Sequence, residues 1–337
     1  MLRPALLLSL LIALSAPAGG DSGVLRIYFV DVEGGQATLF VAPSGQSMLV
    51  DAGWPGADRR DALRIAAAAR DAGVTRIDYL VTTHYHVDHV GGVPNVAAIL
   101  PVGTFVDHGE SVERDGSQAA LLTAYGDARG SSGHVVAKPG DTIPVAGLDV
   151  QVVAAGGKVV DHALPGGGTA NPLCAGFQPK ETDTGENALS VGTVITYGKF
   201  RTIDLGDLTW NVEQQLACPA NLVGPIDLYL TTHHGSDKSG PAVLVQALRP
   251  RVAIMNNGAH KGGSSSTWQI VHDSPGLEDL WQLHRALDSD QAHNVADARI
   301  ANPDESTSHW LLVVARQDGS FTVSNQRTGE TKVYASR

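Results

Sequence analysis

The sequence predicts an α/β fold built from two similar halves, with the sheets of the two halves facing each other. The first observation is an internal repeat, because residues 77–84 read IDYLVTTH and residues 226–233 read IDLYLTTH. The second is another pair of similar segments, one upstream of each copy, LVDAG at 49–53 and TIDLG at 202–206. Chance similarity between buried strands is the alternative. Ligand sites in α/β folds lie beyond the carboxyl ends of strands, so a duplication would bring the matching strand ends to one site.

The chain begins like an exported protein. Arg3 is followed by the apolar run Ala5–Leu14 and then by the small residues Ala16-Pro17-Ala18. This order is typical of a signal peptide, which we place at residues 1–18. The run is shorter than the roughly 20 residues of a membrane span, although an uncleaved N-terminal anchor is the alternative. We expect an exported protein, periplasmic or secreted, in which residues 24–337 form a single domain.

Charge and cysteine content narrow the function classes. The chain carries 24 Lys+Arg against 35 Asp+Glu, a formal net charge of −11, with no basic run. Binding of phosphate backbones depends on clustered cations, so a long nucleic acid or an anionic membrane is not the expected partner. Cys174 and Cys218 lack Cys-x-x-Cys spacing, and in an exported protein such a pair favours a disulfide over free thiols. Nothing in the sequence indicates an oligomeric state.

Strand and helix patterns alternate through the first half. Short apolar runs predict four strands, namely Val24–Val30, Ala37–Val41, Ser47–Val50 and Ile77–Thr82. An alanine-rich segment between the last two predicts a helix over Arg59–Ala72. Residues Ser111–Pro144 are expected to form a helix and then turns, and Gly156–Pro172 a loop rich in glycine and proline.

The second half repeats the alternation. Its predicted strands are Ala188–Tyr197, Phe200–Ile203, Leu228–Thr231 and Val252–Met255. A helix is expected over Pro241–Leu248, and the long polar segment Asn256–Asn302 is expected to be partly helical around Leu277–Leu287. The runs Trp310–Ala315 and Ser320–Ser324 predict a closing hairpin.

The first Thr-Thr-His strand delivers a dense group of metal-binding residue types, THYHVDHVGG at 83–92. Neutral imidazole and carboxylate suit a borderline cation such as zinc. Residues two apart on an extended loop point the same way, so His84 and His86 can bind one ion, while Asp88 and His89 can face a second. A polar loop with scattered histidines is the alternative, but four potential ligands lie within six residues.

This His-x-His-x-Asp-His motif followed by Gly-Gly resembles the signature of the metallo-β-lactamase fold superfamily. The fold that this resemblance implies is a four-layer αβ/βα sandwich. The opening FVDVEGG and the later THHGS at 232–236 look most like the hydrolase domain of the ComEC/Rec2 DNA-uptake proteins and their stand-alone secreted relatives. The likeness covers roughly residues 24–252 and says little about substrate, because this fold serves many hydrolases.

The resemblance implies a centre with two divalent ions, zinc or alternatively manganese. Carried over position by position, it assigns His84 and His86 to the first ion, Asp88 and His89 to the second, Asp207 as the carboxylate that bridges both, and His233 as the last histidine. The internal repeat also favours His233, because it occupies the place of His84. His234 is then a candidate for binding a substrate oxygen, and a structural role in its loop is the alternative.

One part of the family pattern is absent. Many members supply a third histidine to the first ion, but the corresponding stretch ETDTGENALS, residues 181–190, contains none. The resemblance places Asn187 near that position. An amide oxygen is a weak ligand, so the alternatives are a loosely bound first ion, a water in place of the third ligand, or manganese rather than zinc. Asp183 and Glu186 are alternatives, although acidic loop residues are usually only solvated.

The expected activity is metal-dependent hydrolysis. Two nearby cations would lower the pKa of a bridging water, and the metal-bridging hydroxide would attack the substrate. Asp88 is a candidate for returning a proton to the leaving group, and Asp51 and Asp204 for orienting ligand histidines. The leading substrate is a phosphoester, either a phosphodiester or a phosphocholine-type group. The alternatives are a lactone or β-lactam, and a metal-stabilised binding protein without turnover.

A further loop, NNGAHKGGSSSTW at 256–268, follows a strand at the expected active-site end. Its Asn256, Asn257, His260 and Lys261 are candidates to line the substrate pocket. An ordinary flexible loop is the alternative.

Overall fold

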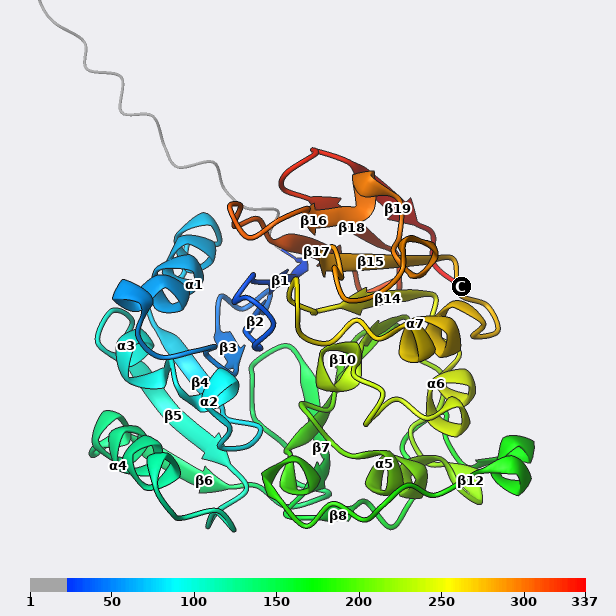
Figure 1. Cartoon of the computed structure of the whole chain (residues 1–337), viewed down its shortest axis with the longest axis horizontal. Coiled ribbons are helices and arrows are strands. Elements are labelled where there is room, and N and C mark those ends of the chain that lie inside the picture. The colour runs from blue at the N-terminus through cyan, green and yellow to red at the C-terminus, as the bar shows by residue number, and fades with distance from the viewer. Residues whose placement is uncertain (1–22) are drawn as a thin grey trace, which may run out of the picture.

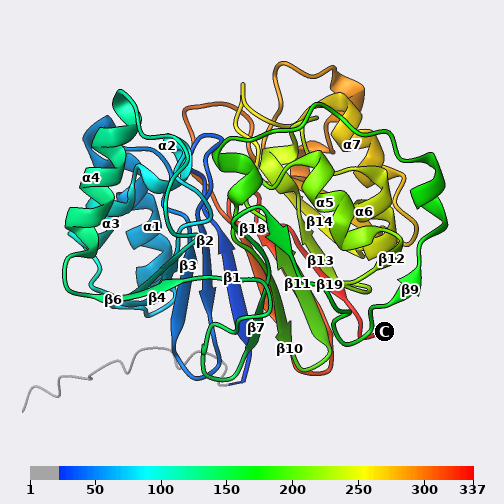
Figure 2. The same ribbon diagram turned by 90° about the horizontal axis from the view of Figure 1, so that it is seen from below.

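The computed structural model describes residues 23–337, so the predicted signal peptide lies outside the described residues. Two mixed sheets pack face to face, and helices cover the outer face of each (Figure 2). The α/β sandwich predicted from the sequence is therefore confirmed.

The first sheet has nine strands in the order β19-β18-β17-β1-β2-β3-β4-β5-β6. These strands are β1 (Leu25–Phe29), β2 (Thr38–Val41), β3 (Ser47–Val50), β4 (Ile77–Val81), β5 (Val102–Asp107), β6 (Gly133–Val136), β17 (Leu311–Ala315), β18 (Phe321–Asn325) and β19 (Thr331–Tyr334). The C-terminal strands thus join the same sheet as the N-terminal ones, through the antiparallel pair β1–β17.

The second sheet has eight strands in the order β16-β15-β14-β13-β11-β10-β7-β8. These are β7 (Asp149–Ala155), β8 (Lys158–Val159), β10 (Gly192–Tyr197), β11 (Phe200–Asp204), β13 (Leu228–Leu230), β14 (Val252–Met255), β15 (Asp279–His284) and β16 (Ile300–Asn302). A small third sheet pairs β9 (Thr169–Ala170) with β12 (Ala220–Asn221).

The two large sheets repeat one pairing scheme. In the first sheet β1–β2 and β2–β3 are antiparallel, whereas β3–β4, β4–β5 and β5–β6 are parallel. In the second sheet β7–β10 and β10–β11 are antiparallel, whereas β11–β13, β13–β14 and β14–β15 are parallel. The strands with the repeated sequences, β3 with β11 and β4 with β13, occupy equivalent places in this scheme. The repeat therefore corresponds to a repeated substructure.

Helices bury the outer face of each sheet (Figure 1). The first sheet carries α1 (Arg60–Asp71), α2 (Val87–Val90), α3 (Val93–Ala97) and α4 (Ser117–Arg129), and the second carries α5 (Trp210–Ala217), α6 (Ala242–Leu248) and α7 (Ser265–His272). One apolar cluster lies between the sheets and one lies under each helical layer. Because both faces of the central strands are covered, strands such as β2 and β14 are buried at every residue.

Most predicted elements are confirmed within one or two residues, including the C-terminal hairpin. The helix predicted around Leu277–Leu287 is wrong, because residues Asp279–His284 form β15, parallel to β14 and to β16. All six residues of this strand are buried. A fully buried strand has no period-two alternation, so it is easily mistaken for part of a buried helix.

The predicted disulfide is confirmed, since Cys174 and Cys218 are bonded with their Cα atoms 5.7 Å apart. It ties the short 3₁₀ helix Pro172–Gly176 to the end of α5. A structural disulfide is consistent with an oxidising, extracytoplasmic compartment. Across residues 23–337, every helix is too short or too polar to cross a bilayer.

Candidate metal centre

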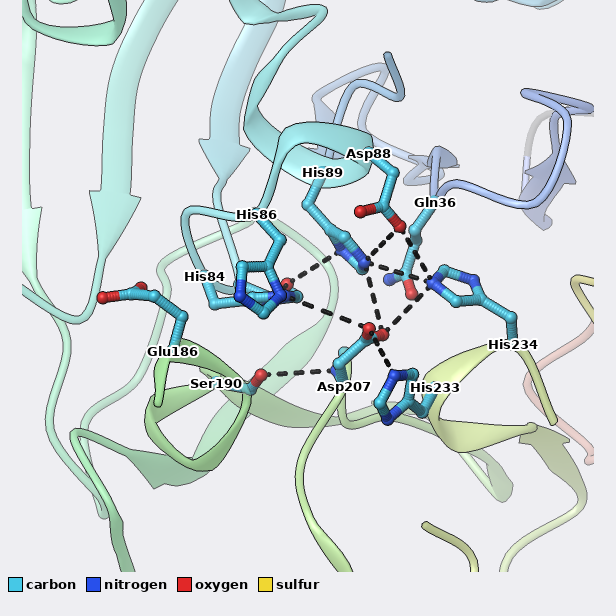
Figure 3. A network of polar contacts seen from close by, with 12 residues as sticks. Gln36, His84, His86, Asp88, His89, Glu186, Ser190, Asp207, His233 and His234 are labelled. Atoms are coloured by element: carbon cyan, nitrogen blue, oxygen red, sulfur yellow. Dashed lines mark hydrogen bonds and ion pairs between the residues drawn. The ribbon is translucent and has the colours of Figure 1, made fainter. Parts of the chain in front are cut away.

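The predicted site residues lie at the carboxyl ends of equivalent strands from both sheets. The loop after β4 carries the His/Asp motif, and the loops after β11 and β13 carry Asp207 and the pair His233-His234. Figure 3 shows their side chains pointing toward one another around Asp207. The duplication therefore does bring matching strand ends to one place.

One compact group consists of Asp88, His89, Asp207 and His234. One ligand atom from each lies within 4.8 Å of the others, and all four residues are buried. His89 Nε2 is 3.2 Å from Asp88 Oδ2 and 3.3 Å from Asp207 Oδ1. His234 Nε2 is 3.3 Å from the same two oxygens. Two imidazoles and two carboxylates thus enclose one point.

A second set of imidazoles faces the other oxygen of Asp207. His233 Nε2 is 3.3 Å from Asp207 Oδ2, and His84 Nε2 is 4.0 Å from it. The His86 ring lies edge-on to the His84 ring, with centroids 4.7 Å apart (Figure 3). The carboxylate of Asp207 therefore stands between two histidine sets, one on each oxygen.

The sequence expectation and the structure differ over the consecutive histidines. His233 was expected to be the last histidine ligand and His234 to contact substrate. The structure instead places His234 in the compact group with Asp88 and His89, and His233 on the side of His84. Both residues have a left-handed backbone, with φ of 57° and 56°. Such a conformation costs a non-glycine residue about 1–2 kcal/mol, and here it accompanies two adjacent imidazoles that converge on one carboxylate.

The environment of Nδ1 selects the tautomer of the ligand histidines. His89 Nδ1 lies 2.7 Å from Asp51 Oδ2, to which it donates. Thr83 donates its hydroxyl hydrogen to the same oxygen at 2.7 Å, so its oxygen accepts from His84 Nδ1 at 3.1 Å. With hydrogen on Nδ1, Nε2 is the nitrogen of each ring that can bind a metal ion. Asp51 thus orients a histidine as expected.

The same logic applies to His233. Ser239 donates its hydroxyl hydrogen to the Leu208 carbonyl at 2.7 Å and can only accept from His233 Nδ1, which is 3.2 Å away. The second predicted orienting residue, Asp204, has another role. It accepts two contacts of 2.9 Å from the Gln36 amide and one from the Gly206 N–H, so it joins the two halves behind the site.

Electrostatics keep two of these imidazoles neutral. Burial lowers the pKa of His84 well below its usual range, and the neighbouring His89 adds to that effect. Burial likewise lowers the pKa of His233 to about 4, although the negative Asp207 opposes it. Neutral imidazole is the form that binds a metal ion, so both rings are ready to do so at neutral pH.

The carboxylates of the site, in contrast, favour positive charge close to them, and His89 lies among three of them. Burial would lower the pKa of His89, but Asp207, Asp88 and Asp51 together raise it well above its usual range. Burial also opposes ionisation of Asp207, yet the surrounding imidazoles, His89 first, hold its pKa well below the ordinary value. Three carboxylates around one imidazole thus form a site that attracts cations.

The residues fit a pair of divalent metal ions. His84 Nε2 and Asp207 Oδ1 are buried and have no hydrogen-bond partner among the described residues. Buried polar atoms are rarely left unsatisfied, and a bound ion would satisfy both. Imidazole nitrogen and carboxylate oxygen are the donors that zinc and manganese accept in proteins.

Among the described residues, the region expected to supply a third ligand to the first ion, residues 181–190, forms no hydrogen bond or ion pair with the rings of His84 or His86. Glu186 is buried and accepts hydrogen bonds from Ser111, from the Tyr85 N–H and from His108, so it holds loops together. Burial opposes the ionisation of Glu186, but His108 and Ser111 lower its pKa to about 2. Asp183 is exposed and caps the backbone of Gly185. Asn187 Oδ1 is buried without a partner.

A second group of metal-binding residue types, Asp31, Glu33 and His284, lies nearby. His284 Nε2 is 2.7 Å from Asp31 Oδ1. Arg64 forms ion pairs of 2.8 and 2.9 Å with both carboxylates. Because an arginine already compensates this charge, we interpret the group as a structural ion-pair network.

Glu213, on α5 behind the histidine pair, should make stability depend on pH. It is fully buried and accepts from the Gly240 N–H at 2.6 Å. Burial raises its pKa from the ordinary 4.5 to about 8. Between these values only the unfolded chain ionises, so this contribution falls as pH rises, by ~1.4 kcal/mol per pH unit. We therefore expect the free energy of unfolding of Glu213→Gln, measured with urea, to increase relative to that of the wild type as the pH is raised from 5 to 8. An unchanged difference between the two proteins across this range would contradict the expectation.

Comparisons with known proteins agree with this description. The family model described as "Metallo-beta-lactamase superfamily" matches residues 30–175. No curated protein matches the sequence.

Three solved structures that match this chain have low sequence identity and TM-scores below 0.5. CmlA, a diiron β-hydroxylase from Streptomyces venezuelae, is 17% identical with a TM-score of 0.40, over 77% of this chain and 48% of that one. Igni18, a metallo hydrolase from Ignicoccus hospitalis, is 14% identical with a TM-score of 0.43, over 76% and 94%. MEM-A1, a subclass B3 metallo-β-lactamase from a soil metagenome, is 16% identical with a TM-score of 0.38, over 74% and 81%. The chain spans about half the length of the hydroxylase. The stretch that the metallo-beta-lactamase superfamily model matches, residues 30–175, includes the His/Asp motif.

Proposed function

We propose that this protein is an exported hydrolase that uses two divalent metal ions and acts on a phosphoester. The observation that carries the proposal is Asp207, whose two carboxylate oxygens face two separate histidine sets at 3.3–4.0 Å. A carboxylate shared in this way is the arrangement expected of a site for two ions.

The proposed ligands divide into two sets that share Asp207. The first ion would be held by His84, His86 and His233, and the second by Asp88, His89 and His234. In this assignment His233 takes the place of the third histidine that residues 181–190 lack. His234 accordingly changes from a substrate-binding candidate to a ligand. Zinc suits these donors best, and manganese is the alternative.

The bound ions would supply a hydroxide nucleophile near neutral pH and stabilise negative charge on the substrate. The protein's own groups position this chemistry. Thr83 and Asp51 hold His84 and His89 with Nε2 directed inward. Asp88 is the most exposed carboxylate of the cluster, at 8% of its side chain. We propose that it accepts the proton of the attacking hydroxide and returns that proton to the leaving group.

A groove of about 570 Å³ opens beside His86 and Asp88 and is the proposed substrate site. Its other lining residues come from α4, from the start of α2 and from the loop before α1, and they are Pro55, Val87, Ser117, Gln118, Ala120 and Leu121. The size fits a small molecule, and the net charge of −11 disfavours a long nucleic acid. The FVDVEGG and THHGS motifs support a relation to the secreted ComEC/Rec2-like hydrolases, and hence a phosphoester substrate.

A second candidate is hydrolysis of a lactone or β-lactam. The apolar lining of the groove favours it, because Pro55, Val87, Ala120 and Leu121 would accept an uncharged ring. This alternative uses the same metal ligands.

A substrate panel tests the proposal. Protein comprising residues 24–337, which we propose acts as one catalytic domain, would be loaded with zinc or with manganese. It would be assayed on bis-nitrophenyl phosphate, nitrophenyl-phosphocholine, nitrocefin and a lactone. We expect hydrolysis of at least one of the two phosphoesters. Activity confined to the last two compounds would establish the second candidate, and metal binding without any turnover would indicate a binding protein.

Export can be tested separately. We propose export with cleavage after residue 18, and the Cys174–Cys218 disulfide supports the extracytoplasmic location. Expression of the full chain with N-terminal sequencing of the extracytoplasmic product checks this site.

A further inference from the structure

Lys261 is a cationic side chain that reaches the proposed metal centre without a role in it. It lies in the loop that follows β14, and its ammonium contacts Asp88 Oδ2. The same ammonium lies 5.1 Å from the centroid of the Trp54 ring, a cation–π distance. Its side chain is 35% exposed, so the charged end is at the mouth of the site.

The loop around Lys261 is fixed to the catalytic loops. The Lys261 carbonyl accepts from the Gly258 N–H at 2.8 Å, and the Gly263 N–H donates to the His234 carbonyl at 2.9 Å. Gly34 packs so closely here that an added Cβ would lie 3.0 Å from Lys261 Cβ. The left-handed Gly262 packs against His234 in the same way, where an added Cβ would lie 2.1 Å from the carbonyl oxygen. The backbone of Lys261 is therefore held in place by the site rather than by a free surface loop.

Charge balance suggests a ligand for this ammonium. Asp88 Oδ2 already lies 3.2 Å from His89 Nε2 and 3.3 Å from His234 Nε2. A divalent ion on these three residues would compete for that oxygen and repel the ammonium. We find no other acceptor for Lys261 Nζ among residues 23–337. The long, half-exposed side chain would then need a new anionic partner beside the ions.

We propose that Lys261, supported by the Trp54 ring, binds a negatively charged oxygen of the substrate's phosphoryl group. This inference rests on the proposed function and adds to it a residue that selects anionic substrates. Lysine serves well as a point charge for phosphate, and the flexible stem allows the small movement away from Asp88.

Inorganic phosphate is the probe for this inference. Its affinity for the zinc-saturated protein would be measured by calorimetry in the wild type and in Lys261→Met, Lys261→Arg and Lys199→Met. Lys199 is an exposed lysine at the turn before β11, at the opposite end of that strand from Asp204. We expect Lys261→Met to weaken phosphate binding about tenfold or more, Lys261→Arg to retain most of it, and Lys199→Met to match the wild type.

Two further measurements separate the possible roles. Zinc content of each variant, by elemental analysis, should stay at the wild-type value, because Lys261 is not a ligand. Unchanged phosphate affinity in Lys261→Met would overturn the inference and leave the lysine as a neutralising partner of Asp88. If Lys261→Met lost affinity for acetate but kept its affinity for phosphate, the inference would also be overturned, in favour of a carboxylate substrate.

This test is independent of turnover. If the substrate panel shows no phosphoester hydrolysis but phosphate binding depends on Lys261, the proposed reaction fails and the anion site stands. If phosphoesters are hydrolysed, Lys261→Met should raise KM more than it lowers kcat.

Discussion

Replacing Asp207 with asparagine is expected to lower hydrolysis by roughly a thousandfold and to lower the metal content below two ions per chain. The physical reason is its position, since one oxygen faces His89 and His234 while the other faces His84 and His233. An amide has nearly the same shape but lacks the negative charge that both ions require. Steady-state kinetics and elemental analysis of the same preparation check both parts.

The matched control for this substitution is Asp127→Asn, at an exposed aspartate on α4. It makes the same chemical change away from the cluster and should leave activity and metal content at wild-type values. If Asp207→Asn retained full turnover and two ions, Asp207 would not be the carboxylate shared by both ions, and the proposed two-ion site would be wrong.

The pair His233-His234 should divide between the two ions. We expect His233→Ala to lose about one ion per chain and His234→Ala to lose the other, because their Nε2 atoms face different oxygens of Asp207. Elemental analysis after removal of free metal gives the stoichiometry. Activity should fall strongly in both variants, by roughly a hundredfold or more.

Double variants show which ion each histidine holds. If His233 belongs with His86, the combination His233→Ala with His86→Ala should retain one ion, whereas His233→Ala with His89→Ala should retain none. His162→Ala is the control, since His162 is exposed and pairs with Asp161. The opposite pattern, in which His233 and His89 share an ion, would contradict the proposed division of the histidines between the two ions.

Local sequence patterns predicted most of the fold. Apolar runs bounded by turn residues identified strands such as β4, β11 and β14, and the repeated Thr-Thr-His marked β4 and β13 as equivalent. The buried strand β15 was missed, because a strand covered on both faces lacks the alternation by which strands are recognised. The short strand β6 at a sheet edge was also missed, because all four of its residues are exposed.

The candidate site was predicted less evenly. The spacing within THYHVDH and the position of Asp207 after β11 sufficed to select most of the residues that meet in space. The repeat, however, equated His233 with His84 and left His234 outside the ligands. The signal that could have shown otherwise is the consecutive pair itself, since two adjacent left-handed residues direct both rings inward. Lys261 could be named as a pocket residue but not connected to Asp88.

By itself the sequence determined the layered α/β class, the duplication, the disulfide partners and the residue types that can bind metal. These depend on local patterns of burial, spacing and donor chemistry, which a single chain segment displays. Only the tertiary structure decided how Asp207 is shared, which histidine faces which of its oxygens, and that a lysine from beyond β14 stands at the mouth. Those properties depend on distances between loops that follow different strands, some in one sheet and some in opposite sheets. Such distances are set only when the strands pair and the two sheets pack together.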